Sequence, residues 1–409
     1  MVELFAGVGG FRVGLEKYFQ TIFFNQYEPG SKEQHAFKVY LSHFPEHNSY
    51  SNMDISEVVS HHLSEIPETF ELLVGGFPCQ DYSVAKPLGR SKGIEGKKGV
   101  LWWDIYKIVK KRLPKYVFLE NVDRLLKSPT SQRGRDFAIM LKTLGSLGYL
   151  VEWRVINSGE QGFPQRRIRV YIVAKKKSSF KDMPKAEASV SFLKNGGLLA
   201  KSYPASKISN FSKFRISGSP SEISDSFPSS STSPFQNSGY YLNGRVYTAK
   251  VEFKKPNRNE NLVDILETDM TKISSEYWLT DEDKVRWEIA KGPTKKPRKD
   301  RETGYEFTYS EGKMPFPDKT DRPSRTIVTG EGGSSPSRFK HIIEQDGKLR
   351  RLIPSELDKL SGFPADWTQK DFSGKIVSDS KRAFFIGNAL VVGVVRRIGK
   401  IIAEDHSQG

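Results

Sequence analysis

Cysteine is almost absent from this sequence, since Cys79 is the only one among 409 residues. A single thiol excludes an internal disulfide framework and argues against a zinc site built on cysteines. Long apolar runs are missing as well: no stretch approaches the ~20 residues that span a bilayer, and the N-terminus does not resemble a signal peptide. These absences predict an intracellular, cytoplasmic protein without a metal site and without a membrane segment.

Acidic residues are outnumbered, because 64 lysines and arginines face 48 aspartates and glutamates and leave a net charge of +16. A chain this basic is expected to bind polyanions, of which nucleic acid is the commonest. The alternative is a basic protein with no such partner. Charge alone does not name a chemistry.

Short apolar runs alternate with helical patterns in the first 175 residues. Strands are predicted at 2–5, 21–26, 70–76, 115–122 and 169–174, and an amphipathic helix at 100–113. This alternation is typical of an α/β fold whose mostly parallel sheet is covered on both faces. The serine-rich segment 202–241 predicts only loops and short strands, and helical spacing returns at 389–405.

A glycine-rich turn, LFAGVGGF (4–11), lies between the first strand and its helix. Glycines there let the backbone approach a ligand, although a purely structural turn is equally compatible with the pattern. In nucleotide-binding sheets an acidic residue ~20 positions later binds the ribose, and Gln26, Tyr27 and Glu28 occupy that place here. Asp54 could accept a bond from an adenine amino group or could cap the helix that follows it.

Cys79 follows the predicted strand 70–76 in the sequence GGFPCQDYS, where two glycines and a proline form a stiff turn. The carboxyl edge of an open α/β sheet is where such folds hold ligands. A free thiol is more often buried and inert, but the polar neighbours Gln80, Asp81 and Ser83 argue against burial here. We therefore interpret Cys79 as a nucleophile, which must react as its thiolate.

Glu120 ends the next predicted strand, in FLENV, at the same expected edge. A glutamate that ends an apolar strand favours a raised pKa and hence proton donation near neutral pH, although it could instead cap the segment after it. With Cys79 one strand away, the pair suggests covalent addition to a ring with acid assistance.

Five segments, in order along the chain, resemble the motifs of bacterial restriction–modification cytosine-C5 DNA methyltransferases. LFAGVGGF resembles the cofactor loop of that family, GFPCQDYS (76–83) its catalytic P-C-Q-x-x-S, and FLENV (118–122) its E-N-V. QRRIRVYIVA (165–174) is similar to the Q-x-R-x-R strand, and IGNAL (386–390) to the G-N motif near the C-terminus. The similarity covers residues 1–175 and 320–400.

The resemblance implies an α/β fold with a Rossmann-like S-adenosylmethionine-dependent methyltransferase sheet and a second, smaller, irregular or β-rich target recognition domain. The catalytic and cofactor-binding domain would comprise residues 1–175 and 325–409, and the DNA-binding recognition domain residues 176–324. RPSRTIVTGEGG (322–333) resembles the motif that braces one domain against the other.

The family mechanism implies a role for each catalytic residue. Cys79 would attack C6 of a cytosine flipped out of double-stranded DNA, while Glu120 engages the ring nitrogen and C5 accepts a methyl group from S-adenosyl-L-methionine. Arg167 resembles the arginine that reaches the base and its backbone, and Arg169 the one that orders the site. S-adenosyl-L-homocysteine would be the product.

The cofactor would be bound, by the same resemblance, by residues of the glycine turn, the next two strand ends and the C-terminal motif. These are Phe5, Ala6, Gly7, Gly9, Gly10, Gln26, Tyr27, Asp54, Ile55, Pro78, Asn388 and Ala389. Position 26 is a glutamine where the family usually carries an acid, so either Gln26 or Glu28 would bind the ribose.

Residues 83–99 resemble the mobile loop that closes over the flipped base. DNA contacts are expected from this segment and its surroundings, namely Gln80, Ser83, Lys86, Arg90, Lys97 and Arg167. The partners implied are double-stranded DNA and, functionally rather than physically, a cognate restriction endonuclease; an orphan role is equally consistent. We expect a monomer, as is frequent in the family.

Three other functions compete with this interpretation. The main RNA cytosine methyltransferases use two cysteines, and the tRNA-methylating relatives carry an extra cysteine motif, whereas this chain has one cysteine. A catalytically silent DNA-binding homologue would not need Cys79, Glu120 and both arginines. A nicotinamide dehydrogenase shares the fold class but leaves the P-C-Q and E-N-V motifs unexplained.

Overall fold

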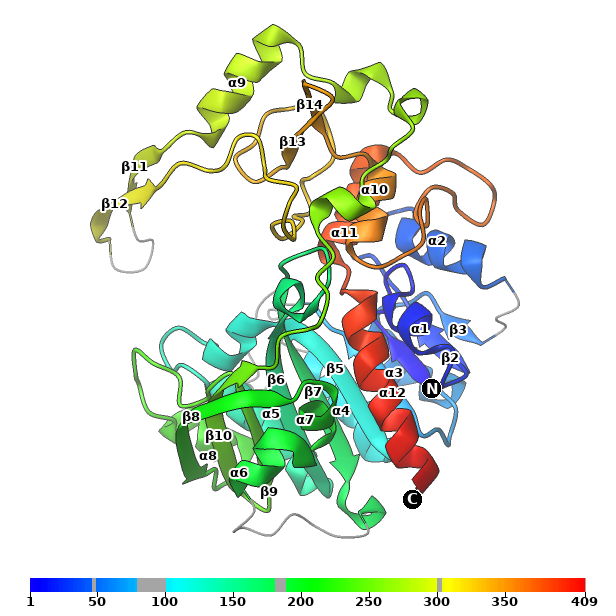
Figure 1. Cartoon of the computed structure of the whole chain (residues 1–409). Helices are drawn as coiled ribbons and strands as arrows, with labels where there is room; N and C mark the ends of the chain where they lie inside the picture. Colours follow the sequence, from blue (N-terminus) through cyan, green and yellow to red (C-terminus); the bar gives the residue numbers. More distant parts are fainter. Residues whose placement is uncertain (46–48, 79–100, 181–188, 300–303, 409) are drawn as a thin grey trace.

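A ten-stranded sheet dominates the structure, a computed structural model that describes residues 1–45, 49–78, 101–180, 189–299 and 304–408 (Figure 1). Its strand order is β3-β2-β1-β4-β5-β7-β6-β9-β10-β8. The strands are β1 (Val2–Leu4), β2 (Phe23–Asn25), β3 (Tyr50–Ser51), β4 (Leu72–Gly76), β5 (Tyr116–Val122), β6 (Tyr149–Asn157), β7 (Ile168–Lys176), β8 (Ala205–Arg215), β9 (Ser238–Leu242) and β10 (Arg245–Phe253). The first five are parallel, and β7 pairs antiparallel with β5.

Helices cover both faces of the sheet, as predicted. Side chains of β4 and β5 alternate between two buried clusters: Leu72 and Val74 pack on one face, and Leu73 on the other. The first face is covered by α1 (Gly10–Leu15) and α12 (Val392–Gln408), and the second by α3 (Ile55–His61), α4 (Leu101–Arg112) and α5 (Arg135–Ser146). Burial on both faces explains why these strands read as nearly continuous apolar runs.

The last helix, α12, lies against the first, α1, so the two ends of the chain form one helical layer on this face of the sheet. Two glycines allow this contact. A Cβ on Gly14 would lie 2.8 Å from Cγ1 of Val395, and one on Gly399 would lie 2.0 Å from Cδ2 of Leu15. Any larger residue at Gly399 would require the buried Leu15 side chain, or the helix that carries it, to move.

The segment between 202 and 241 departs from the sequence prediction. Loops and short strands were expected, but β8 spans 11 residues and, with β9 and β10, extends the main sheet beyond β6. Most side chains of β8 are exposed at the sheet edge, so no apolar periodicity marks the strand. β9 pairs with β6, and α7 (Leu198–Ser202), which precedes β8, is held to β6 by two buried side chains: Glu152 accepts the amides of Leu198 and Leu199, and Arg154 donates to the carbonyl of Tyr203.

A second part of the chain, the small lobe (residues 262–353), stands apart from the sheet in Figure 1. It contains α9 (Asp281–Lys291) and two antiparallel hairpins, β11 (Thr294–Lys299) with β12 (Glu306–Glu311) and β13 (Ile342–Gln345) with β14 (Lys348–Arg351). The elements α10 (Pro354–Leu360) and α11 (Asp379–Asn388) lie between this lobe and the sheet. The expected smaller β-containing unit is therefore present. None of the helices in the described ranges is long and apolar enough to cross a membrane.

Candidate active site

The glycine turn after β1 adopts the strained conformation that its sequence predicts. Phe5, Gly7 and Gly9 have positive φ angles of 54°, 55° and 92°. This region suits glycine, but it costs an L-residue such as Phe5 about 1–2 kcal/mol. The turn is fixed in part by Gln26, whose Oε1 accepts the amide of Gly7 at 2.6 Å.

A cavity of about 190 Å³ opens at this turn, at the carboxyl ends of β1, β2, β4 and β5. Nine of the predicted cofactor residues line it: Phe5, Ala6, Gly7, Gly10, Gln26, Tyr27, Pro78, Asn388 and Ala389. The carboxylate residue Glu120 lines the same cavity. Residues from positions 5 and 389 meet here because α11 and α12 return beside the N-terminal turn.

Three predicted cofactor residues do not line the cavity. Asp54 caps α3, since its Oδ1 accepts the amide of Ser56 at 2.9 Å, which is the alternative that the sequence left open. Ile55 belongs to the buried core. Gly9 turns away from the cavity toward α2 (His35–His43), where a Cβ would lie 3.1 Å from the ring of Phe44.

Gln26 and Glu28 both line the cavity, and both already have partners within the chain. Gln26 is buried and holds Gly7, as above. Glu28 accepts the amide of Ala36, in the first turn of α2, at 2.8 Å. Either side chain could present a second oxygen lone pair to a ribose hydroxyl.

Glu120 forms an ion pair with Arg169, whose Nε lies 2.9 Å from its Oε1. Burial raises the pKa of Glu120, while the positive charges of Arg169 and Arg167 act against that rise. Gly76 is the register partner of Glu120, and a Cβ there would lie 3.3 Å from Oε2 of the carboxyl group. The glycine therefore leaves room beside the carboxylate, between it and Pro78.

Arg167 is buried rather than exposed to the cavity. Its guanidinium donates to the carbonyls of Ile327 at 3.4 Å and Gly387 at 2.9 Å. The preceding Gln165 is also buried: its Oε1 accepts the amide of Ile327, and its Nε2 donates to the carbonyl of Leu360. The Q-x-R-x-R strand thus joins the sheet to segments from the C-terminal third of the chain.

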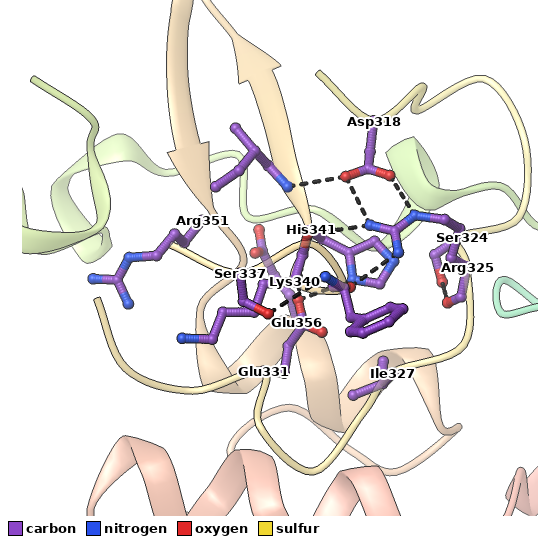
Figure 2. Close-up of polar contacts among 12 residues, drawn as sticks. Asp318, Ser324, Arg325, Ile327, Glu331, Ser337, Lys340, His341, Arg351 and Glu356 are labelled. Carbon is purple, nitrogen blue, oxygen red and sulfur yellow. Dashed lines mark hydrogen bonds and ion pairs between the residues drawn. The ribbon is translucent and has the colours of Figure 1, made fainter. Parts of the chain in front are cut away.

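A polar cluster in the small lobe continues this connection (Figure 2). Asp318 accepts bonds from Arg325 at 2.7 and 3.1 Å, from Lys291 at 3.2 Å and from the amide of Ile342 at 3.1 Å. The neighbour of Arg325, Ser324, accepts the amide of Arg166 at 2.9 Å. The motif 322–333 therefore contacts both parts of the protein.

Cys79 and five of the predicted DNA-contacting residues lie outside the described residues. The five are Gln80, Ser83, Lys86, Arg90 and Lys97. Pro78, which precedes Cys79 in the sequence, is the last described residue of that stretch and lines the cavity.

Several cavity residues were not predicted from the sequence. Phe11, Gly76, Phe384, Phe385 and Leu390 line it together with the predicted set. Phe11, Gly76 and Leu390 lie within the recognised motifs LFAGVGGF, GFPCQ and IGNAL, and Phe384 and Phe385 directly precede IGNAL, so the signal for all five was available in the sequence. Within the described ranges, no group of three or more His, Cys, Asp or Glu side chains is arranged to hold a metal ion.

Comparison with known proteins agrees with this geometry. The family model of the C-5 cytosine-specific DNA methylases matches residues 1–404. The type II methyltransferase M.Sau3AI of Staphylococcus aureus is 40% identical over 100% of this chain and 96% of its own length. M.NgoBI of Neisseria gonorrhoeae is 38% identical over 42% of this chain and 49% of its own length. The crystal structure of S. pombe Dnmt2 methyltransferase has the same fold, with a TM-score of 0.59 at 15% identity over 100% of this chain and 98% of that one.

Proposed function

Because the chain belongs to the C-5 cytosine-specific DNA methylase family, we propose that it methylates cytosine through Cys79 and Glu120 at the cavity beside β4 and β5. The protein is an S-adenosylmethionine-dependent DNA cytosine methyltransferase of the restriction–modification type. One observation carries the assignment of the site: the buried Glu120 carboxyl, paired with Arg169, lines the same cavity as the glycine turn and Pro78.

The residues of the cavity fit the chemistry of S-adenosylmethionine. Phe5, Phe11 and Tyr27 offer apolar and aromatic surface for an adenine ring, while Gln26, Glu28 and Asn388 offer polar groups for hydroxyl and amino-acid moieties. When bound, this cofactor supplies an electrophilic methyl group on a sulfonium centre. We assign its binding to the predicted residues that line the cavity, and of Gln26 and Glu28 we favour Gln26 because it also orders Gly7.

The chain's own groups account for activation of the cytosine. A cytosine ring is electron-poor and does not attack a methyl donor, so the Cys79 thiolate adds to C6 and turns C5 into a nucleophile. This addition moves negative charge toward the ring nitrogen. Glu120, in its protonated form, stabilises that charge by donating a proton. Loss of the C5 proton and departure of Cys79 restore the aromatic ring. Arg169 orients the Glu120 carboxyl.

The target carbon is inaccessible in stacked DNA, so the cytosine must leave the duplex. We assign recognition of the duplex to the region 176–324, and within it to the part that belongs to the small lobe (262–324), because strands β8–β10 are committed to the main sheet. The side chains of the segment that follows Cys79 would contact phosphates and the flipped base. The enzyme would act in the cytoplasm as a monomer, alongside a cognate restriction endonuclease.

The test is methyl transfer from radiolabelled S-adenosylmethionine to duplex DNA and, in parallel, to tRNA. We expect label in duplex DNA only, and bisulfite sequencing of the product then gives the target sequence. Cys79→Ser should abolish covalent trapping on DNA that contains 5-fluorocytosine, while duplex binding remains. Label in tRNA alone would refute the substrate, and trapping by Cys79→Ser would refute the nucleophile.

A further inference from the structure

The glycine turn has a strained backbone, and hydrogen bonds from other parts of the chain help to hold it. Three of the five residues 5–9 are left-handed, and one of them, Phe5, has a side chain. Such conformations persist only where the surroundings hold them. Within the N-terminal part, the turn is held by Gln26 at Gly7, by the carbonyl of Asn25 at Ala6, and by the bond from Gly9 to Ala6. The central carbonyl of the turn, on Val8, needs a partner from elsewhere because Val8 is buried.

That partner is Trp367, from the segment between α10 and α11. Its indole Nε1–H donates to the Val8 carbonyl at 2.8 Å. Trp367 does not line the cavity, so its action on the site passes through the turn. Trp367 is 359 residues away from Val8 in the sequence, and its side chain lies beside His43 of α2.

Trp367 is itself held from both sides. Its ring stacks on His43 of α2, with the ring centroids 3.4 Å apart and the planes at 5°, and its carbonyl lies 2.6 Å from Nε2 of His43. Its neighbours Asp366 and Thr368 are both hydrogen-bonded to Arg382, and Thr368 also bonds to Asp358. Arg382 belongs to α11, whose C-terminal residues line the cavity.

We propose that Trp367 is a positioning residue for cofactor binding: its indole N–H fixes the Val8 carbonyl and so keeps the turn 5–10 in the shape that receives S-adenosylmethionine. The turn is preorganised in the free protein, and the ordering cost is removed from the binding step. This inference rests on the proposed cofactor site. It adds a residue from the C-terminal part of the chain that lies outside the lining of the cofactor cavity.

The test variant is Trp367→Phe, which keeps an aromatic ring beside His43 and removes the indole donor together with part of the ring surface that stacks there. One hydrogen bond is worth about 0.5–1.5 kcal/mol, so we expect the Kd of S-adenosyl-L-homocysteine to rise roughly 2- to 13-fold in calorimetry. The KM for S-adenosylmethionine should rise equally, while kcat at saturating cofactor and the KM for DNA stay within about two-fold. Amide exchange at Gly9 and Gly10 should accelerate in the free variant.

Calorimetry also separates positioning from loss of folding. Partial unfolding lowers the number of binding sites per chain, whereas a loosened turn lowers the affinity at an unchanged number of sites. Trp278→Phe, in the small lobe, is the matched control and should leave the Kd unchanged. An unchanged Kd in Trp367→Phe, or a parallel loss of kcat and DNA binding, would overturn the proposal. Failure of the unaltered protein to bind S-adenosyl-L-homocysteine would instead overturn the cofactor site itself.

Discussion

Two opposing influences act on the carboxyl group of Glu120. Burial raises its pKa, and the charges of Arg169 and Arg167 pull it back toward the ionised form. A proton donor works best when its pKa lies near the working pH, so the ion pair at 2.9 Å tunes this residue as well as orienting it. With Glu120 as the proton donor that we propose, the protonated form is the active one, and activity should be lost as the pH rises through the pKa of Glu120.

Replacing Arg169 should therefore shift the alkaline limb of the pH–activity profile to higher pH. In Arg169→Met the first opposing charge is gone, the pKa of Glu120 rises further, and the protonated carboxyl survives to higher pH. The measurement is kcat/KM for duplex DNA against pH. Arg124→Met, an exposed arginine four residues from Glu120, is the control and should leave the limb in place. A limb that moves to lower pH would contradict the assignment of Glu120 as the donor.

For single residues, the sequence predicted members of the site but not the hydrogen-bond and ion-pair partners of each side chain. Glu120 and Arg169 were each predicted as site residues, from FLENV and QRRIR, and in the structure they contact each other. The burial of Arg167 against the carbonyls of Ile327 and Gly387 could not be read from the strand, because both partners come from segments far along the chain. Its expected contact with the base stays a prediction.

Among the elements, the turn after β1 was predicted from its glycines alone, and the structure contains that turn. LFAGVGG was predicted to turn tightly, and Gly7 and Gly9 take positive φ angles, which glycine adopts without the steric cost that a side chain adds. Gly9 is also crowded, since a Cβ would lie 3.1 Å from Phe44 and 3.3 Å from Tyr40.

We expect Gly9→Ala to destabilise the protein by about 1–2 kcal/mol, the cost of a left-handed conformation in an L-residue. The loss should appear as a lower midpoint in urea unfolding monitored by tryptophan fluorescence. Gly312→Ala provides the comparison, because Gly312 has no positive φ and a Cβ added there would meet no heavy atom within 4 Å. Equal midpoints for the two variants would show that the turn is not strained.

Burial alone did not decide which strands the sequence predicted, since the buried strand β6 was missed. Five predicted strands of the first 175 residues correspond to β1, β2, β4, β5 and β7. The edge strand β8 was missed because most of its side chains face solvent, so its sequence carries no apolar alternation. The antiparallel direction of β7 was not visible either, since direction depends on connections rather than on residue pattern.

For the whole molecule, the net charge of +16 should govern the encounter with DNA. Each phosphate neutralised by lysine or arginine releases condensed counterions, which gives a slope of about −0.9 in log K against log salt per contact. With ~6–10 contacts, affinity should fall by roughly 10³–10⁵-fold between 50 and 200 mM salt. Fluorescence anisotropy with a labelled duplex measures the slope. Affinity that does not change with salt would exclude a binding mode dominated by phosphate contacts.

The cluster around Asp318 lies near the junction between the sheet and the small lobe. Asp318, which is buried, pairs with Arg325 (Figure 2) and with the fully buried Lys291, and its loss would remove the carboxylate that both cations share. Breaking a buried ion pair in this way costs about 3–5 kcal/mol. Lys291 ends α9, and Arg325 is adjacent in sequence to Ser324, which accepts the amide of Arg166. Loss of Asp318 should therefore change the orientation of the small lobe relative to the sheet.

Asp318→Asn should therefore raise the KM for duplex DNA at least about ten-fold, while the Kd of S-adenosyl-L-homocysteine stays within about two-fold, because the cofactor cavity has no wall from the small lobe. Asp321→Asn is the matched control: that carboxylate is three residues away, 70% exposed, and pairs with the exposed Arg322. An exposed pair of this kind contributes little, so both constants should be unchanged. If Asp318→Asn weakened cofactor binding as much as DNA binding, the cluster would stabilise the whole fold rather than align the lobe that we assign to DNA recognition.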